Sequence, residues 1–139
     1  MTNDEKTAVD TVMRFLACYA DRNVEACMAF LTTSRAVFML GTNANEVFRT
    51  ADEVRSAFAR DFASMNSIRW GQERHMHVVT ASDLASVIVE LPISYESDGE
   101  SVATIFRYAL TLAKENQQWK ICSGLASVPF TEGTYRFTE

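Results

Sequence analysis

The fold is decided by residues 84–113, LASVIVELPISYESDGESVATIFRYALTLA, in which two long runs of β-branched and aromatic residues flank an Asp-Gly pair. Asp98-Gly99 in this setting predicts a two-residue turn that joins two antiparallel strands into a hairpin. With the turn closed, the opposite pairs are Tyr95–Val102, Leu91–Phe106, Val89–Tyr108 and Val87–Leu110. These large side chains share one face, so the sequence predicts a hairpin with one strongly apolar side.

A second turn, at Asn116-Gln117, adds another strand to this sheet. The predicted pairs across it are Leu112–Ile121, Leu110–Ser123, Tyr108–Leu125 and Phe106–Ser127. Because a slip of one residue would turn a whole strand over, the agreement of the two registers supports both turns. The opposite face is then predicted to carry mostly small residues, namely Ser86, Ile88, Glu90, Ala103, Ile105, Arg107, Ala109, Cys122, Gly124 and Ala126. Helices can cover the apolar face, and another sheet can approach the flat one.

The first half of the chain has mainly helical periodicity. The predicted elements are a helix over residues 4–20, a second helix from Asp21 to about Leu31, a strand over residues 35–40, and a third helix from Thr50 to about Met65. Capping boxes begin the first and third helices, formed by Thr2 with Glu5 and by Thr50 with Glu53, and Asp21 is the expected cap of the second. Helices collected before strands predict an α+β fold rather than a βαβ fold.

Composition and charge limit the class of protein. The 139 residues are 47% hydrophobic, and no linker rich in Pro, Gly or Ser interrupts them, which predicts a single domain over residues 1–139. The net charge of −5 and the pI near 5.0 argue against nucleic-acid binding, which needs Lys and Arg gathered on one face. The uncharged stretches are too short to span a membrane, and the acidic, polar N-terminus is unlike a signal peptide. We expect a cytoplasmic protein with no nucleic-acid or membrane partner.

Metal ligands and cofactor motifs are sparse in the sequence. Cys18, Cys27 and Cys122 are scattered and form no C-x-x-C motif, so buried free thiols are expected rather than disulfides or a zinc site. His75 and His77 project from the same side of a predicted strand and could supply two metal ligands, but no third ligand is evident. We therefore expect no metal ion and no cofactor.

Residues 68–80 form a further predicted strand with several polar side chains. With the following turn centred on Ala81-Ser82, the inner-face residues are Trp70, Gln72, Arg74, Met76 and Val78. The two histidines then point away from the interior, whereas a turn one residue longer exchanges the two sets. An inward Arg74 could hold a carboxylate or an enolate through two hydrogen bonds, and an Arg74 at the rim would be solvated.

Several short strings follow one another along the chain in a fixed order. They are Ala29-Phe30-Leu31 before Ala36-Val37-Phe38, Gly41-Thr42 before Glu46, Arg107-Tyr108-Ala109-Leu110, Trp119-Lys120-Ile121 and Ser127-Val128-Pro129. In this order they resemble the SnoaL-like branch of the nuclear transport factor 2-like superfamily, which includes ketosteroid isomerases and polyketide cyclases. The resemblance covers nearly the whole chain and implies a cone-shaped fold with three N-terminal helices packed on a curved, mainly antiparallel sheet. Enzymes, ligand binders and interaction modules share this scaffold, so the resemblance implies a fold rather than a reaction.

The chain departs from the relatives at the positions that carry their chemistry. Phe15 stands where ketosteroid isomerases have a tyrosine that stabilises the enolate, and Met39 stands near the position of their general-base aspartate. Ser123-Gly124-Leu125 replaces the His-x-His that SnoaL-like relatives often carry before the last strand ends. These departures imply that the chain lacks the catalytic groups of a ketosteroid isomerase.

The resemblance also implies a cone whose wide end often stays open as a small-molecule pocket. The residues that we expect to bind a ligand there are Tyr19, Trp70, Gln72, Arg74, Tyr108 and Ser123. The competing interpretation is that the aromatic residues among them are ordinary core.

On the outer face of the sheet, Glu90 is predicted to lie opposite Arg107 as a structural charge pair. The small residues around this pair leave a smooth surface, and relatives commonly dimerise through the same face. We therefore expect a two-fold homodimer.

Three functions remain as alternatives at this point. The first is a dimeric protein that binds a small apolar or aromatic molecule, including an anionic one, in the cone. The second is a dimerisation or scaffolding module whose cavity is filled by side chains. The third is an isomerase-like or cyclase-like enzyme with rearranged acid and base residues, which would need His75 or His77 to point inward.

Overall fold

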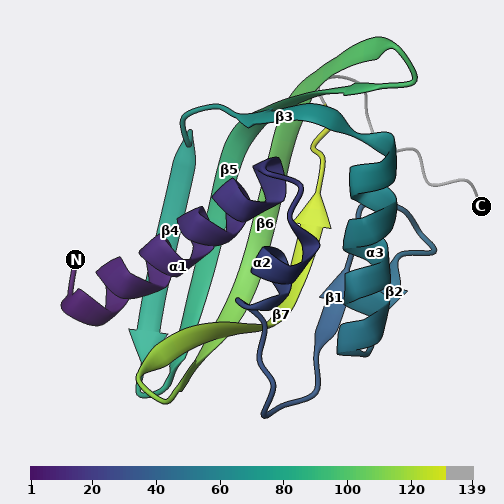
Figure 1. The fold of residues 1–139 in the computed structure, drawn as a ribbon. Helices are drawn as coiled ribbons and strands as arrows, with labels where there is room; N and C mark the ends of the chain where they lie inside the picture. The colour runs from purple at the N-terminus through teal and green to yellow at the C-terminus, as the bar shows by residue number, and fades with distance from the viewer. Residues whose placement is uncertain (131–139) are drawn as a thin grey trace, which may run out of the picture.

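Seven strands form one curved sheet, and three helices cover one of its faces, in the computed structural model, which describes residues 1–130 (Figure 1). The elements are α1 (Asn3–Ala20), α2 (Val24–Met28), β1 (Phe38–Leu40), β2 (Val47–Phe48), α3 (Ala51–Ser64), β3 (Asn66–Trp70), β4 (His75–Ala81), β5 (Leu84–Ser97), β6 (Glu100–Glu115) and β7 (Gln118–Ser127). The strand order is β2-β1-β7-β6-β5-β3, with β4 also paired to β5, and every pair except β1–β7 is antiparallel. The predicted α+β class is confirmed. Residues 131–139 of the predicted single domain lie outside the described part.

The β5–β6 hairpin has the predicted register along its whole length. All four predicted pairs are present, from Tyr95 opposite Val102 to Val87 opposite Leu110. Asp98 and Gly99 both have a positive φ, of 52° and 77°, as the favoured two-residue hairpin turn requires. Local turn chemistry and the apolar pattern therefore select the same pairing.

The β6–β7 pairing follows the prediction only as far as Leu112 opposite Ile121. Beyond this point Cys122 is an extra residue in β7, a β-bulge, and its thiol donates a hydrogen bond to the Thr111 carbonyl oxygen at 3.3 Å. The other three predicted pairs are wrong, because the observed pairs are Leu110–Gly124, Tyr108–Ala126 and Arg107–Ser127. The bulge turns Gly124 and Ala126 to the inner face and moves Ser123 and Leu125 to the outer face.

The strand predicted over residues 68–80 is two strands, β3 and β4, which pair with successive parts of β5. The break faces Pro92 of β5, which has no N–H to offer to an edge strand. The Gly71 N–H donates to the Pro92 carbonyl oxygen at 2.8 Å, and a Cβ at Gly71 would lie only 3.0 Å from the Pro92 ring. A proline on one strand and a glycine on the other therefore interrupt the regular alternation that the prediction assumed.

The helix boundaries follow their caps. The Thr2 and Glu5 capping box begins α1, and the Thr50 hydroxyl accepts the Glu53 N–H at 3.1 Å at the start of α3, both as predicted. The second helix is shorter than predicted, and its cap is Asn23 rather than Asp21. Asn23 is the cap because its side chain accepts the Ala26 N–H, while Asp21 still belongs to the end of α1.

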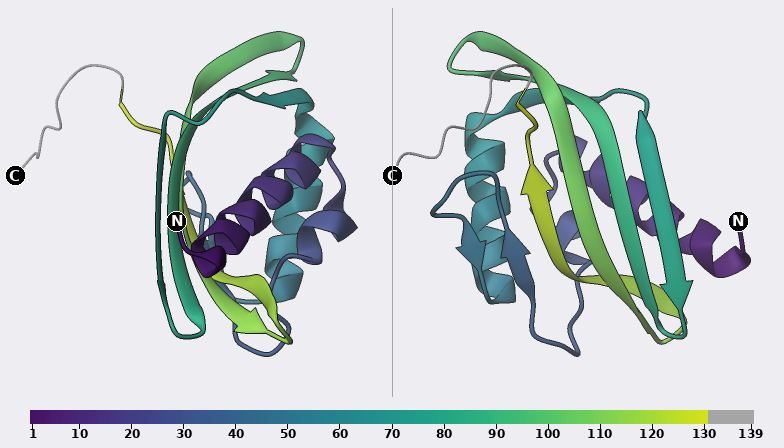
Figure 2. Two further views of the ribbon diagram at one scale, coloured as in Figure 1. Left: turned by 90° about the vertical axis from the view of Figure 1, so that its left-hand side faces the viewer. Right: turned by 180° about the vertical axis from the view of Figure 1, so that it is seen from behind.

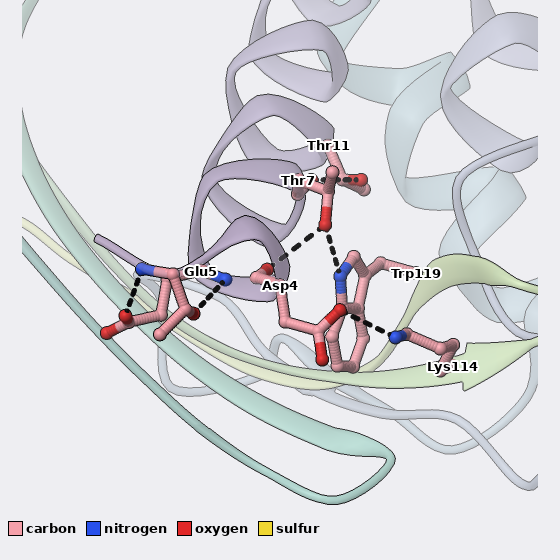
Figure 3. A network of polar contacts seen from close by, with 7 residues as sticks. Asp4, Glu5, Thr7, Thr11, Lys114 and Trp119 are labelled. Carbon is pink, nitrogen blue, oxygen red and sulfur yellow. Dashed lines mark hydrogen bonds and ion pairs between the residues drawn. The ribbon is translucent and has the colours of Figure 1, made fainter.

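The start of α1 is fastened to the β6–β7 hairpin by a polar network (Figure 3). The Trp119 indole donates to the Thr7 hydroxyl at 3.0 Å, and the Lys114 ammonium lies 2.7 Å from the Asp4 carboxylate and 4.9 Å from the centre of the Trp119 ring. This fastening holds one end of α1 against the sheet.

The helices described within residues 1–130 include none with the length and apolar character of a membrane-spanning segment.

Candidate functional site

A cavity of about 300 Å³ lies between the inner face of the sheet and helices α1 and α3. The aromatic side chains around it are Phe15, Tyr19, Phe48, Phe58, Trp70, Tyr95, Phe106 and Tyr108. They reach the cavity because α1 and α3 turn their apolar stripes toward the sheet and alternate residues of β5 and β6 point inward. The cavity is therefore a mostly apolar space of the kind that holds small molecules.

The main polar feature of the cavity is a hydrogen-bonded pair from two helices. The Tyr19 hydroxyl of α1 donates to Asp61 Oδ2 of α3 at 2.8 Å, and the Met65 sulfur lies 3.7 Å from the same hydroxyl. Burial raises the pKa of the Asp61 carboxyl, and the nearby Glu46 raises it further, while the hydrogen bond from Tyr19 opposes this shift. Burial raises the pKa of Tyr19 as well, so the phenol keeps its proton at neutral pH.

Tyr108 supplies a second hydroxyl to the cavity from β6. The residue is 9% exposed, and its hydroxyl has no hydrogen bond to any other residue of the range 1–130. No fully enclosed side-chain polar atom in this range lacks a partner, so the Tyr108 hydroxyl must reach the open space of the cavity. Burial and the nearby Asp61 raise the pKa of Tyr108, and it therefore remains a neutral phenol.

Trp70 forms a wall rather than a polar contact point. Its indole N–H is already used, since it donates to the Leu16 carbonyl oxygen of α1 at 2.8 Å. Its ring lies between those of Tyr19 and Phe106, with centroid distances of 6.1 Å and 5.8 Å. Three of the predicted site residues, Tyr19, Trp70 and Tyr108, are thus brought together around one cavity.

The other three predicted site residues do not line the cavity. Gln72 is exposed and Arg74 is turned outward, both within the break between β3 and β4, and Arg74 Nε lies 3.6 Å from the Glu90 carboxylate on the outer face. Ser123 faces outward because the Cys122 bulge reverses the strand. The expected placement of Gln72, Arg74 and Ser123 is therefore wrong.

The remaining orientations predicted for this edge are confirmed. Met76 lies opposite Val89 and Val78 opposite Val87, and all of them contribute to the core. His75 lies on the outer face opposite Glu90, and His77 follows two residues later on the same side. The enzyme alternative that required an inward histidine loses that support.

Asp61 and Glu46 are functional candidates that the sequence analysis missed. Asp61 follows Val54 by seven residues and Phe58 by three, so it belongs to the same helical face as the apolar residues of α3. A carboxylate on the apolar face of a helix is the signal in the sequence that could have identified Asp61 as a site residue. Glu46 gives no comparable signal, because its place at the cavity depends on the turn between β1 and β2, where its side chain accepts the Asn43 N–H at 2.8 Å.

Within residues 1–130, the charged side chains that line the cavity are acidic. Asp61 and Glu46 line it, and no Lys, Arg or His does so in the described part of the chain. Phe15 and Met39, which we expected at or near the positions of the isomerase donor and base, also line the cavity and offer no ionisable group. An anionic ligand would therefore meet like charge and no cationic partner.

The outer face has the reverse arrangement around a single carboxylate. Glu90 is held by Arg107, whose Nε lies 2.6 Å from Oε2, with Arg74 at 3.6 Å and His75 at 3.8 Å from Oε1. The hydrogen bond from Arg107 is the main cause of a lowered pKa for Glu90. The predicted Glu90–Arg107 pair is confirmed.

Residues 1–130 contain no group of three or more His, Cys, Asp or Glu side chains suited to a metal ion.

Comparison with solved structures agrees with this architecture. A candidate dehydratase of the NTF2-like family from Streptomyces avermitilis superimposes with a TM-score of 0.84 at 18% identity, covering 92% of this chain and 97% of the other. A ketosteroid isomerase-like protein from Erwinia carotovora gives 0.78 at 14% identity, with coverages of 92% and 98%. A candidate scytalone dehydratase from Novosphingobium aromaticivorans gives 0.79 at 11% identity, with coverages of 96% and 89%. At these identities the likeness concerns the fold.

Sequence comparison gives the family itself. None of the curated proteins matches the chain. The family model of the SnoaL-like domain matches residues 9–131, which is most of the chain. The protein belongs to the SnoaL-like family of the NTF2-like fold.

Proposed function

We propose that the protein binds a small, largely apolar or aromatic molecule in the cavity between α1, α3 and the sheet. The observation that carries this proposal is the Tyr108 hydroxyl, which has no hydrogen bond within residues 1–130 and reaches an aromatic-walled space from a mostly buried residue. A ligand that fills this space removes water from the hydroxyl, and a hydrogen bond from the ligand then offsets the cost of that desolvation. The anionic version of the ligand is not retained, because Arg74 lies on the outer face.

The open volume weighs against the scaffolding alternative. That alternative requires side chains such as Phe15, Phe62 and Trp70 to fill the interior, yet about 300 Å³ is left open between them and the sheet. A space of this size is at the lower end of the usual range for ligand sites, roughly 300–1,000 Å³. The ligand should accordingly be small.

The test is to fill the cavity from one side of the sheet. Ala126→Phe places a ring in the cavity, and Ala109→Phe places the same ring on the opposite face as a matched control. Neutral aromatic probes such as 2-naphthol and tryptophol should perturb the amide NMR signals of cavity residues in the wild type and in Ala109→Phe. Loss of this response in Ala126→Phe is expected, and equal binding by both variants would place the ligand elsewhere.

A second candidate function, proton transfer by a rearranged acid–base set, is favoured by the Tyr19–Asp61 pair. Asp61 has a raised pKa, which makes it a stronger base, and it lines the cavity, where Tyr108 could donate to a carbonyl oxygen. The dehydratase and isomerase-like names of the structural neighbours agree with such chemistry. Exchange of the α-protons of 2-tetralone in D₂O, followed by NMR, tests it. Asp61→Asn should abolish any protein-dependent exchange, and exchange that persists would exclude Asp61 as the base.

We also propose that two copies pair through the outer face. Figure 2 shows the three helices on one side of the sheet and no helix over the other side within residues 1–130. Val79, Ile88 and Leu125 expose 47–50% of their surface there, around the small Ala109.

Sedimentation of Ala109→Arg tests this arrangement. An arginine buried without a partner should dissociate the pair. The control is Asp52→Arg on α3, an exposed position on the helical side of the molecule. A monomeric wild type, or an unaffected Ala109→Arg dimer, would contradict the proposed interface.

A further inference from the structure

We infer that the cavity is built for an amine, that is, for a ligand with a small aromatic or apolar body and a protonated amino group held between Asp61 and Tyr108. This inference deepens the proposed function and rests on it. It concerns the charge of the ligand, which neither the fold nor the family decides.

The first support is the sign of the charge in the lining. The carboxylates of Asp61 and Glu46 are the charged groups that line the cavity in residues 1–130. Arg60, whose positive charge lowers the pKa of Asp61, is exposed and lies outside the lining. Charge interactions are stronger in a partly enclosed apolar space than in water. A cation therefore gains attraction here that a neutral ligand lacks, and an anion is repelled.

The second support is the free hydrogen-bonding capacity around Asp61. Tyr19 occupies Oδ2, and no residue of the described chain donates to Oδ1. Tyr108 is 9% exposed as a whole residue, and its hydroxyl has no hydrogen bond within residues 1–130, so its oxygen can accept one. An ammonium group has three N–H donors, which suits an acceptor set of one carboxylate oxygen and one phenol oxygen.

The third support is the aromatic wall. Tyr19, Phe58 and Trp70 line the cavity together with Asp61, and the ring centroids of Phe58 and Trp70 each lie 6.1 Å from that of Tyr19, whose hydroxyl contacts the carboxylate. Faces of aromatic rings attract cations, and such contacts contribute more when water is excluded. Carboxylates combined with aromatic walls thus favour an ammonium over an alcohol of the same shape.

The experiment compares three indole probes that differ mainly in charge, namely tryptamine, tryptophol and indole-3-acetate. Calorimetric titration at pH 7 should show tryptamine binding at least about tenfold more tightly than tryptophol, with indole-3-acetate weakest. Asp61→Asn should remove the advantage of tryptamine and leave tryptophol binding in place. Asp52→Asn, on the exposed side of the same helix, changes the net charge equally and should leave the advantage intact.

A second variant, Tyr108→Phe, allows the same test if Asp61→Asn does not fold. Tyr108→Phe retains the ring and removes the acceptor, and it should reduce the tryptamine advantage about threefold or more. Tryptophol binding as tight as tryptamine, or an advantage that survives both Asp61→Asn and Tyr108→Phe, would overturn the amine assignment while the proposed cavity stands. Failure of all three probes to bind would contradict the assignment and the proposed function together.

Discussion

Two carboxylates, Asp61 above the inner face of the sheet and Glu90 on its outer face, show how differently the two sides of one sheet treat the same chemical group. Glu90 is only 7% exposed, yet its pKa is lowered, because the Arg107 guanidinium lies 2.6 Å away. Asp61 is half-buried, yet its pKa is raised, because burial outweighs the hydrogen bond from the neutral Tyr19 phenol, which by itself lowers the pKa. The charge of the partner, rather than depth alone, decides the direction.

This difference separates a structural group from an available one. Both carboxylate oxygens of Glu90 are in ion pairs, Oε2 with Arg107 and Oε1 with Arg74 and His75. These contacts link β5 to β6 on one side and to the start of β4 on the other. Asp61 keeps one oxygen without a donor in the described chain and faces the cavity. The carboxylate that faces a cavity without cationic side chains is therefore the candidate for function, and the one held by two arginines is the structural group.

The largest expected effect tests which residues face each side beyond the Cys122 bulge. Gly124→Val should destabilise the protein by about 2–3 kcal/mol, because the inner face is already filled there. A Cβ at Gly124 would lie 2.5 Å from Leu110 Cδ2 and 3.3 Å from the Met39 sulfur. The neighbouring Ser123→Val, on the outer face, should change stability by less than about 0.5 kcal/mol. Urea unfolding of both variants measures the two losses of stability. If the strand had no bulge, Ser123→Val would show the large loss and Gly124→Val the small one.

A medium effect is expected from removing the phenol that holds Asp61. Tyr19→Phe should cost about 1 kcal/mol at neutral pH, because the carboxylate loses its hydrogen bond in a partly buried place. The same change should raise the pKa of Asp61 further, since the lost bond favoured the charged form. Tyr95→Phe is the control, because Tyr95 lines the same cavity and its hydroxyl has no hydrogen bond within residues 1–130. If an NMR titration shows that the pKa of Asp61 is no higher in Tyr19→Phe than in the wild type, this account is contradicted.

The smallest effects concern pH, and the two carboxylates should respond with opposite sign. The lowered pKa of Glu90 gives stability that is present above its ordinary value of 4.5 and is lost as the pH falls through the folded value. The raised pKa of Asp61 instead costs stability at neutral pH, and this cost disappears as the pH falls toward the ordinary value of 3.8. Glu90→Gln should therefore be less stable than the wild type at pH 7, with a gap that narrows in acid.

Asp61→Asn provides the other half of this pH comparison. Its amide oxygen can still accept from Tyr19, so the variant should be at least as stable as the wild type at pH 7, and the gain should vanish in acid. Urea midpoints measured from pH 3 to pH 7 for both variants test the pair of signs. Parallel curves would show that the two environments do not differ as described.

Most of the fold could be predicted from the sequence, because its signals are local. Asp98-Gly99 and the apolar alternation on either side select the β5–β6 pairing, and Thr2 and Thr50 mark the helix starts. Each of these signals lies within a few residues of its effect. They also place Tyr19, Trp70 and Tyr108 on the inner side, where the cavity is found.

The rest of the site depends on contacts between segments that are distant along the chain. Pro92 and Gly71 break the edge strand and leave Arg74 outside, and the extra residue Cys122 turns Ser123 outward. Alternation along one strand carries no information about where its partner is missing a donor or where one strand is a residue longer. The amino-acid sequence by itself therefore determined the strands, the helix caps and the apolar side of the sheet. Only the tertiary structure decided which polar groups meet in the cavity, because that depends on how α3, the β1–β2 turn and the bulge close around it.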